Sequence, residues 1–465
     1  MLSKPTNARS KNDSNAIVLA ISIFTFGSAL PISTINVALP DIASDLNLSA
    51  SQISWVPLIF LLASVILVLP CGRVADLYGR MRVFKLSIWF VLVSAIGTAL
   101  APTAELLLAL RFCQGCAAAV GFVLLISIIS SAVDKSSRGR AFGIIASAMY
   151  FGLTAGPLMA GYATSYVGWR ATFLLHVPFM FVALVIANLK IHSEWRIAKG
   201  GRFDWAGAAI YAVGVVLLTL GALSIPANYS IVLLIAGAIG LVKFARQQLA
   251  QPHRLINVEL FKQNKVFTYS CLASIFMYAA NFSSLILVSL YLQYIKAIPA
   301  EIAGWVLMVN PLTTAFFTPF AGRASDSFEP KYVASIGITL TAVGLFILAF
   351  LTNTSSLGII IMAMIAMGVG FAFFAPVNAH AIMGSIDERD YATGAGAHAS
   401  VRLIGQLSSM AAVSIIFALI IGPTQINPEI YPELAVALKY CFGLAALACL
   451  PAYYYSINRG QVLTS

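Results

Sequence analysis

The chain has 465 residues, of which 60% are hydrophobic and only 10% are charged. Soluble globular proteins carry about 25% charged residues, so this composition excludes a soluble enzyme or binding domain and indicates a polytopic membrane protein. The net charge of +11 could suggest nucleic-acid binding, but the basic residues cluster in particular connections between apolar stretches, which is typical of a topology signal.

Fourteen apolar stretches are long enough to span a membrane, since a spanning helix needs about 20 mainly apolar residues. They are 16–39, 52–71, 83–101, 105–127, 140–163, 172–190, 205–223, 229–246, 268–292, 301–321, 332–351, 356–380, 393–421 and 434–455. The connections are short, so we expect an all-α membrane protein without a sizeable soluble domain. The first stretch continues past the length of a signal peptide, and we expect it to be retained.

The basic residues predict the orientation. With a cytoplasmic N-terminus, only Arg170, Lys296 and Lys439 of the 28 lysines and arginines lie toward the outside, and Arg111 and Arg402 fall within helices. Because basic connections remain cytoplasmic, we expect both termini on the cytoplasmic side of a bacterial inner membrane. We expect the lipid bilayer, and no nucleic acid, among the partners.

The two halves of the chain are related. Trp55 precedes Gly72-Arg73…Asp76 by the same interval that separates Trp305 from Gly322-Arg323…Asp326. Parallel repeats of this kind build transporters that hold substrate near the membrane midplane between two halves. We therefore expect six-helix bundles over 1–190 and 268–465, with 191–267 as an inserted two-helix segment between them.

Several motifs of this sequence resemble the major facilitator superfamily, and in particular its fourteen-helix drug:proton antiporter family (DHA2-type, multidrug efflux). In the turn Gly72–Arg82, Gly72, Asp76, Gly79 and Arg80 match the family's loop between helices 2 and 3. Further matching stretches are Thr34–Pro40, Arg111–Gly115, Gly152–Gly161, Trp169–Pro178 and Phe203–Gly207. The resemblance implies the major facilitator fold with 6+2+6 helices and alternating-access transport.

The turn is also a candidate gate. Asp76 could accept hydrogen bonds from a helix N-terminus or pair with an arginine, and the resemblance implies that such contacts lock the cytoplasmic side. The gating candidates are Gly72, Arg73, Asp76, Gly79 and Arg80. The alternative is that the basic residues only fix topology.

A second candidate is the fifth-helix motif of Gly152, Gly156, Pro157 and Gly161. Small residues permit close helix packing, and proline removes a backbone donor. By resemblance this is the antiporter motif; plain packing is the alternative.

Two arginines fall within membrane helices, where such residues are costly and usually functional. The resemblance assigns Arg111 to proton coupling or to the cavity. We expect it to pair with Glu105, with Gln114 or with an anionic substrate. The alternative is that its side chain snorkels toward the membrane surface. Arg402 in the thirteenth helix is a candidate functional residue for the same reason.

An acidic residue is absent where the family commonly has one. The family's first helix often reads D-x-T-I-V-N-V-A-L-P, and here Pro31 replaces the aspartate. None of the 17 acidic residues lies at the middle of an expected helix. A buried carboxylate is the simplest group that binds either a proton or a cation, so we expect an anionic, zwitterionic or neutral substrate. The remaining proton-coupling candidates are Arg111, Glu105, Asp41 and His176, with His380 and His398; each histidine could instead be an ordinary packing residue.

Polar and aromatic residues in the expected path-lining helices form the candidate substrate cavity: Asn36, Trp55, Gln114, Asn281, Gln293, Trp305, Asn310, Asn378 and Arg402. Amides in membrane helices could alternatively bridge neighbouring helices.

Together these features favour a proton-coupled exporter of small amphipathic solutes, acting as a monomer. No phosphate-binding loop is present, and we expect no enzyme activity, cofactor or metal. The rivals are an importer or uniporter on the same fold and a transport-inactive membrane sensor.

Overall fold

The structure is a computed structural model that describes residues 11–134, 137–196, 203–251, 255–387 and 391–461. Within these ranges the chain is helical and contains no β-strand. Fourteen helical spans are long and apolar enough to cross a membrane, which confirms the predicted fold class. The basic residues expected within 1–10, 135–136, 197–202, 252–254 and 388–390 lie outside the described residues.

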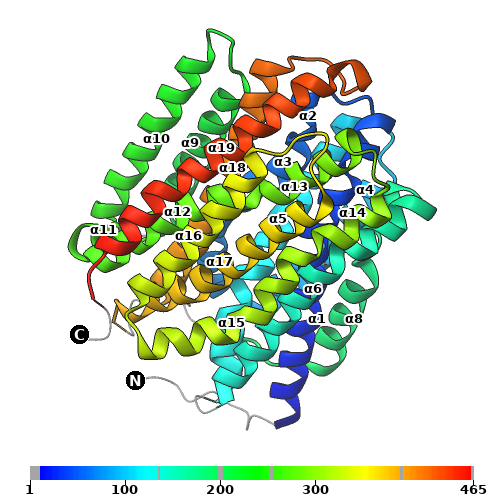
Figure 1. Cartoon of the computed structure of the whole chain (residues 1–465). Coiled ribbons are helices and arrows are strands. Elements are labelled where there is room, and N and C mark those ends of the chain that lie inside the picture. Colours follow the sequence, from blue (N-terminus) through cyan, green and yellow to red (C-terminus); the bar gives the residue numbers. More distant parts are fainter. Residues whose placement is uncertain (1–10, 135–136, 197–202, 252–254, 388–390, 462–465) are drawn as a thin grey trace, which may run out of the picture.

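The first six spans come from the N-terminal part of the chain (Figure 1): α1 (Lys11–Asp45), α3 (Trp55–Tyr78), α4 (Arg80–Ala99), α5 (Ala104–Ala132), α6 (Arg138–Tyr166) and α8 (Val177–Lys190), with the short helices α2 (Ala50–Ile53) and α7 (Trp169–Thr172). The middle segment forms α9 (Trp205–Leu223), α10 (Ser230–Ala250) and α11 (Val258–Gln263). We call α1–α8 the first bundle.

The remaining spans are α12 (Lys265–Phe282) with α13 (Ser284–Leu290) and the π-helical turn η2 (Tyr291–Ile295), α14 (Ala300–Leu307) with α15 (Val309–Ser327), α16 (Pro330–Ala349), α17 (Leu357–Gly384), α18 (Tyr391–Ile420) and α19 (Tyr431–Asn458), which follows the short η4 (Pro428–Ile430). We call α12–α19 the second bundle. The expected continuous helix 268–292 is interrupted at Ser283, whose backbone N–H donates to the Ser409 hydroxyl instead of to a helix carbonyl.

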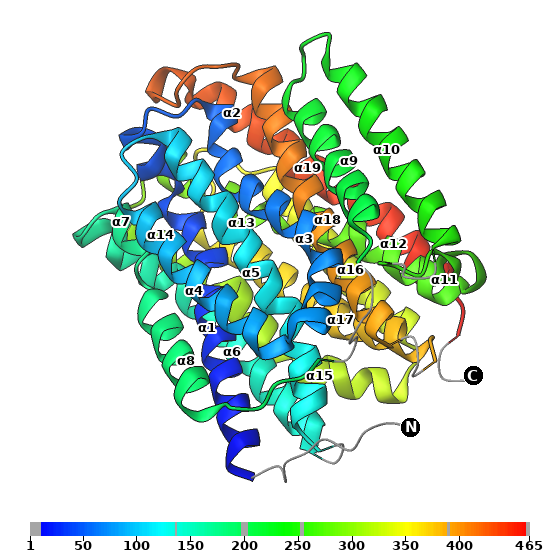
Figure 2. The same ribbon diagram turned by 180° about the vertical axis from the view of Figure 1, so that it is seen from behind.

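The start of α1 and the end of α19 lie on one side of the helix array, toward the lower left in Figure 1, which we call the terminal side; the other is the distal side. Figure 2 shows α9 and α10 together along one edge. Their close approach requires glycines, since a Cβ on Gly237 would lie 2.7 Å from the Leu218 nitrogen. The Tyr211 hydroxyl of α9 donates to the Val65 carbonyl of α3, which holds this pair against the first bundle. The exact division into bundles and inserted segment stays a prediction.

The two bundles are joined at the distal side. Gln293 Nε2 donates to the Val37 carbonyl at 3.0 Å, and the backbone N–H of Glu301 donates to Ser165 Oγ at 3.2 Å. The backbone N–H of Ala50 likewise donates to the Thr424 carbonyl at 2.8 Å. We call this set of contacts the distal seam. These contacts hold the two bundles together at that end.

Glycines show the contrast between the two sides. At the distal seam, a Cβ on Gly161 would lie 2.7 Å from the Ala300 carbonyl oxygen. Near the terminal side, side chains built on Gly139 and Gly143 of α6 or on Gly322 of α15 would meet no atom within 4 Å. Along α6, the packing is therefore tight at Gly161 and open at Gly139 and Gly143.

Candidate functional site

The turn between α3 and α4 is organised by Arg80. Its Nε donates to Asp76 Oδ1 at 2.8 Å, and its Nη1 donates to the Ser127 carbonyl at 2.9 Å and to Ser131 Oγ at 2.7 Å on α5. The turn itself needs a glycine, because Gly79 has a φ of +114°, a conformation that L-residues with a Cβ rarely adopt. Arg80 and Asp76 are therefore paired as predicted, and they tie the turn to α5.

Glu194 completes this turn, and the sequence analysis did not single it out. Its carboxylate accepts the backbone N–H groups of Met81 at 2.9 Å and Arg82 at 3.0 Å. These are free donors of the first turn of α4, where a negative charge is also favourable. Glu194 fills the space beside Gly79, where a Cβ would lie 2.7 Å from its carboxyl carbon. The other candidates of the turn, Gly72 and Arg73, lie half-buried on α3.

Inside the first bundle, Arg111 is fully enclosed, with 2% of its surface exposed. Its Nη1 donates to Gln114 Oε1 at 2.7 Å and its Nε donates to the Val56 carbonyl at 3.4 Å. The guanidinium also lies over the Phe60 ring, 4.7 Å from its centroid. Gln114 Nε2 in turn lies 3.1 Å from His176 Nε2. The three side chains form one buried cluster, which we call the Arg111 cluster.

The two acidic candidates for this cluster lie elsewhere. Glu105 is exposed in the first turn of α5, and Asp41 is exposed near the distal end of α1. Of the alternative partners expected for Arg111, Gln114 and not Glu105 contacts it in this conformation, and the Arg111 side chain does not snorkel toward the surface. A helix places residues three apart on one face, which is why Gln114 could be anticipated from the sequence, whereas His176 lies on another element.

Arg402 of α18 lies between the two bundles, near polar and aromatic residues of both. Its guanidinium carbon lies 6.0 Å from the centroid of Phe122 on α5. Tyr150 of α6 and Tyr278 of α12 lie close to Arg402, and Tyr150 also lies close to Thr318 of α15. Among the described residues, no acidic side chain forms an ion pair with Arg402, and its buried Nε has no hydrogen-bond partner. We call these residues the Arg402 cluster.

Other candidates for the substrate cavity instead form hydrogen bonds between neighbouring helices, as the alternative interpretation of these amides predicts. Asn310 donates to the Met364 carbonyl at 3.3 Å, joining α15 to α17. Asn378 is fully buried and donates to the Ser270 carbonyl at 2.9 Å. Both side chains therefore pack within the second bundle. Gln293 belongs to the distal seam.

The remaining candidates are more varied. Asn36 is buried in α1, and Asn281 on α12 has a buried Oδ1 without a partner. Trp305 is 47% exposed. The structure does not gather all the predicted cavity residues into one site.

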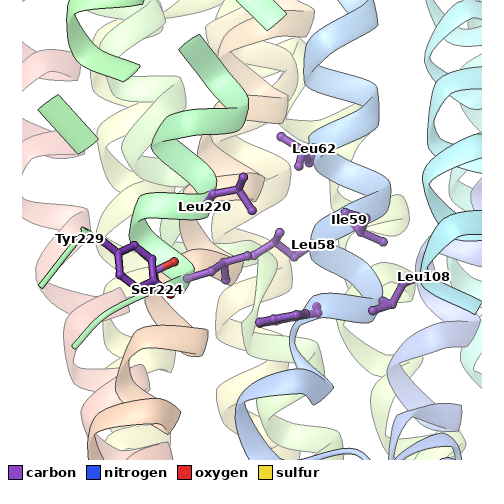
Figure 3. A pocket seen from close by; sticks show the side chains of 9 residues that line it. Leu58, Ile59, Leu62, Leu108, Leu220, Ser224 and Tyr229 are labelled. Carbon is purple, nitrogen blue, oxygen red and sulfur yellow. The ribbon is translucent and has the colours of Figure 1, made fainter. Parts of the chain in front are cut away.

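Trp55 lies at the edge of the first bundle. Its indole N–H donates to Ser414 Oγ of α18 at 3.3 Å. It also lines an apolar cavity of about 330 Å³ between α3, α5 and α9. Figure 3 shows Leu58 and Leu62 of this cavity on the side of α3 toward Leu220, with Ser224 and Tyr229 at one end and Ile59 near Leu108 at the other. Nothing in this cavity carries a charge.

The glycines of the fifth-helix motif bring α6 against two neighbours. A Cβ on Gly152 would lie 2.5 Å from the Phe26 carbonyl oxygen of α1, and one on Gly156 would overlap the Ser33 hydroxyl. Gly161 meets α14 instead, and a Cβ on Gly304 of α14 would touch the carbonyl of Pro157. This motif packs α6 between α1 and α14, so it contributes to the distal seam.

Arg459, at the end of α19, is a buried residue that sequence reasoning treated as an ordinary cytoplasmic cation. Its side chain is inaccessible, and its Nη1 donates to Asn378 Oδ1 at 2.6 Å and to Ser270 Oγ at 3.4 Å. Burial lowers the pKa of this guanidinium to about 10. Since Asn378 and Ser270 are more than 80 positions away along the chain, no local pattern could have revealed this contact.

Comparison with known proteins identifies the family of this architecture. The family model described as Major Facilitator Superfamily matches residues 21–244 and 270–460. The chain belongs to the Major Facilitator Superfamily. The resemblance noted in the sequence is thereby confirmed, and the helices and clusters described above belong to a transporter fold.

Members of this superfamily with assigned names are similar over much of the chain. The riboflavin transporter RibZ of Clostridioides difficile is 24% identical over 433 residues, covering 93% of this chain and 94% of that protein. The lincomycin resistance protein LmrB of Bacillus subtilis is 26% identical over 359 residues, covering 73% of each. The multidrug resistance protein Stp of Mycobacterium tuberculosis is 23% identical and covers 76% of this chain and 65% of that protein.

Solved structures agree in fold. A peptide transporter POT in complex with sulfate superposes with a TM-score of 0.72 at 16% identity, covering 98% of this chain and 97% of that chain. A D-xylose–proton symporter gives a TM-score of 0.68 at 14% identity, with 96% and 99% covered. At such low identity these likenesses establish the major facilitator fold and not a substrate.

Proposed function

We propose that this protein is a proton-coupled exporter of small amphipathic solutes that are anionic or neutral, working by alternating access as a monomer in a bacterial inner membrane. The observation that carries the substrate class is the Arg402 cluster. Its guanidinium lies between the two bundles without an acidic partner among the described residues, and it is bordered by aromatic residues of both bundles.

This arrangement favours anions for an electrostatic reason. A cation entering the site would meet an unpaired positive charge in a low-dielectric region, where repulsion is strongest. An anion or an electron-rich carbonyl group would supply the partner that the guanidinium lacks, and the rings of Phe122 and Tyr278 would cover the apolar part of the solute. The name of one relative, a riboflavin transporter, is compatible with this class, since riboflavin is uncharged and has a planar ring system.

The direction of export rests on orientation and on relatives. The placement of basic residues puts the terminal side in the cytoplasm, so the distal seam would be the closed outer gate, and solute would enter from the cytoplasm. Two relatives are named as resistance proteins, which supports efflux over import. The rivals remain an importer or uniporter on this fold and a transport-inactive sensor.

The substrate class can be tested with purified protein in liposomes, using an anionic dye, riboflavin and a lipophilic cation as probes. We expect uptake of the anionic or the neutral probe into inverted vesicles, and none of the cation. Arg402→Gln should reduce the transport of the anionic probe, whereas Arg402→Lys should retain more of it because it keeps the charge. Equal transport of the cationic probe, unaffected by either substitution, would contradict the proposal.

A further inference from the structure

The Arg111 cluster contains a histidine whose protonation state follows from its contacts. Arginine can only donate hydrogen bonds, so the Gln114 atom that Arg111 contacts at 2.7 Å is the carbonyl oxygen. The other end of the amide is therefore an NH2 group, and it faces His176 Nε2 at 3.1 Å. An NH2 group can only donate, so His176 Nε2 accepts and carries no proton. His176 is consequently neutral, with its proton on Nδ1.

The environment opposes a second proton. A proton on Nε2 would point at the Gln114 NH2 group and would add a positive charge beside that of Arg111. The Nδ1–H group is buried without an acceptor in either protonation state, so no contact on that side would stabilise the charged ring. A buried charge without a partner costs several kcal/mol. The conformation with a closed distal seam thus holds only the neutral histidine.

Other charged groups do not alter this balance. Among the charged groups on the helices that pack against the start of α8, Arg111 lies close enough to His176 to interact with it. The other charged side chains that the structure describes on α1, α4 and α5 lie toward the helix ends: Asp41, Asp45, Arg80, Arg82, Lys85 and Glu105. Arg170 on α7 pairs with Asp45 at 2.6 Å. No acidic group among the described residues forms an ion pair with His176 in this conformation.

The backbone of His176 lies against α1 about one helical turn from Pro31, the position at which the family commonly has an aspartate. Its backbone carbonyl oxygen would lie 3.7 Å from a Cβ placed on Gly27, and Gly27 lies near the middle of the span Ser14–Asp45. His176 is thus a titratable group that is fully buried within the first bundle.

We propose that His176 is the proton-binding site of this protein and that its protonation favours opening of the distal seam. In the closed conformation the proton is rejected; in a conformation opened at the distal side, water could solvate the imidazolium. A proton, like any ligand, shifts a conformational equilibrium toward the state that binds it more tightly. The place of this step in an exchange cycle rests on the proposed function, in which a proton from outside would bind as the solute leaves. The proton site itself does not depend on any substrate.

The test measures the distal seam without substrate. Spin labels are attached at Ser44→Cys on α1 and Glu433→Cys on α19, both exposed at that side, in a variant whose six native cysteines are replaced. Distances are measured from about pH 8 to about pH 5, across the range in which histidine titrates. We expect the population of longer distances to rise on acidification, and His176→Gln to abolish this rise, because glutamine can still accept from Gln114 but cannot be protonated.

The controls are His192→Gln, which removes an exposed histidine, and His398→Gln, which removes the half-buried histidine near Arg402. Both should respond to pH as the parent does. If His176→Gln proves unstable, His176→Asn is the second variant and should give the same result. A pH response that persists in the His176 variants, is lost in His398→Gln, or is absent from the parent protein overturns the proposal. Failure to find a transported compound would instead count against the proposed function alone.

Nitrogen-15 NMR checks which ring nitrogen of His176 carries the proton. In protein with ¹⁵N-labelled histidine at about pH 8, the signal that disappears in His176→Gln should have the pattern of an Nδ1–H tautomer. An Nε2–H pattern for this residue would contradict the hydrogen-bond assignment on which the proposal is based.

Discussion

Replacing Glu194 by alanine tests how the α3–α4 turn is held. The carboxylate, which is 25% exposed, accepts two backbone N–H groups at the start of α4. Loss of an N-terminal cap costs about 0.5–2 kcal/mol, and loss of a negative charge at a helix N-terminus costs about 0.3–1 kcal/mol. The pair with Arg82 adds little, because its 3.9 Å separation and the 71% exposure of Arg82 leave it well solvated.

We therefore expect Glu194→Ala to weaken the first turn of α4 by about 1–2 kcal/mol, which corresponds to a factor of about 5–30 in the local opening equilibrium. Amide hydrogen exchange measured by mass spectrometry should show this increase in peptides that contain Met81 and Arg82. Glu194→Gln should have a smaller effect, because one acceptor oxygen remains. Glu105→Ala, which removes an exposed acid of α5, should leave these peptides unchanged. Unaltered exchange in Glu194→Ala would show that the carboxylate does not cap α4.

Three further substitutions probe the packing. Gly156→Val should destabilise the protein by about 1–3 kcal/mol because it overpacks the contact with α1, whereas Gly143→Val, at a position with open space, should leave the melting temperature nearly unchanged. Arg459→Met should lower the melting temperature, because it leaves Asn378 Oδ1 unpaired at a cost of about 1–3 kcal/mol. Combining Arg459→Met with Asn378→Leu should recover part of the lost stability. A further decrease in the melting temperature of the double variant would contradict this reasoning. Trp55→Phe removes one hydrogen bond between the bundles, so it should favour distal opening by about 1 kcal/mol, measured by the distance between spin labels across the distal seam.

The sequence was sufficient for the features that depend on local pattern. Continuous apolar stretches predicted all fourteen spans, because hydropathy decides whether a segment enters a membrane. The Asp76–Arg80 and Arg111–Gln114 pairs could also be anticipated, because residues three or four apart share a helix face.

Contacts between distant segments could not be predicted. Glu194 lies 113 positions from Met81, and His176 lies 62 positions from Gln114. Nothing in the local sequence distinguishes Arg459 from the other basic residues near helix ends, although Arg459 is buried. Such pairings depend on how the helices pack, and they also decided that Asn310 and Asn378 bridge helices within the second bundle.

The central claim, that solute movement is coupled to protons without an acid at the membrane midplane, is tested most directly by measuring both fluxes together. Purified protein in inverted vesicles would be supplied with the anionic dye or riboflavin while a pH-sensitive dye reports proton movement. We predict proton efflux that depends on the solute and disappears in His176→Gln. Solute movement without any proton signal would contradict the claim and would indicate facilitated diffusion or coupling to another ion.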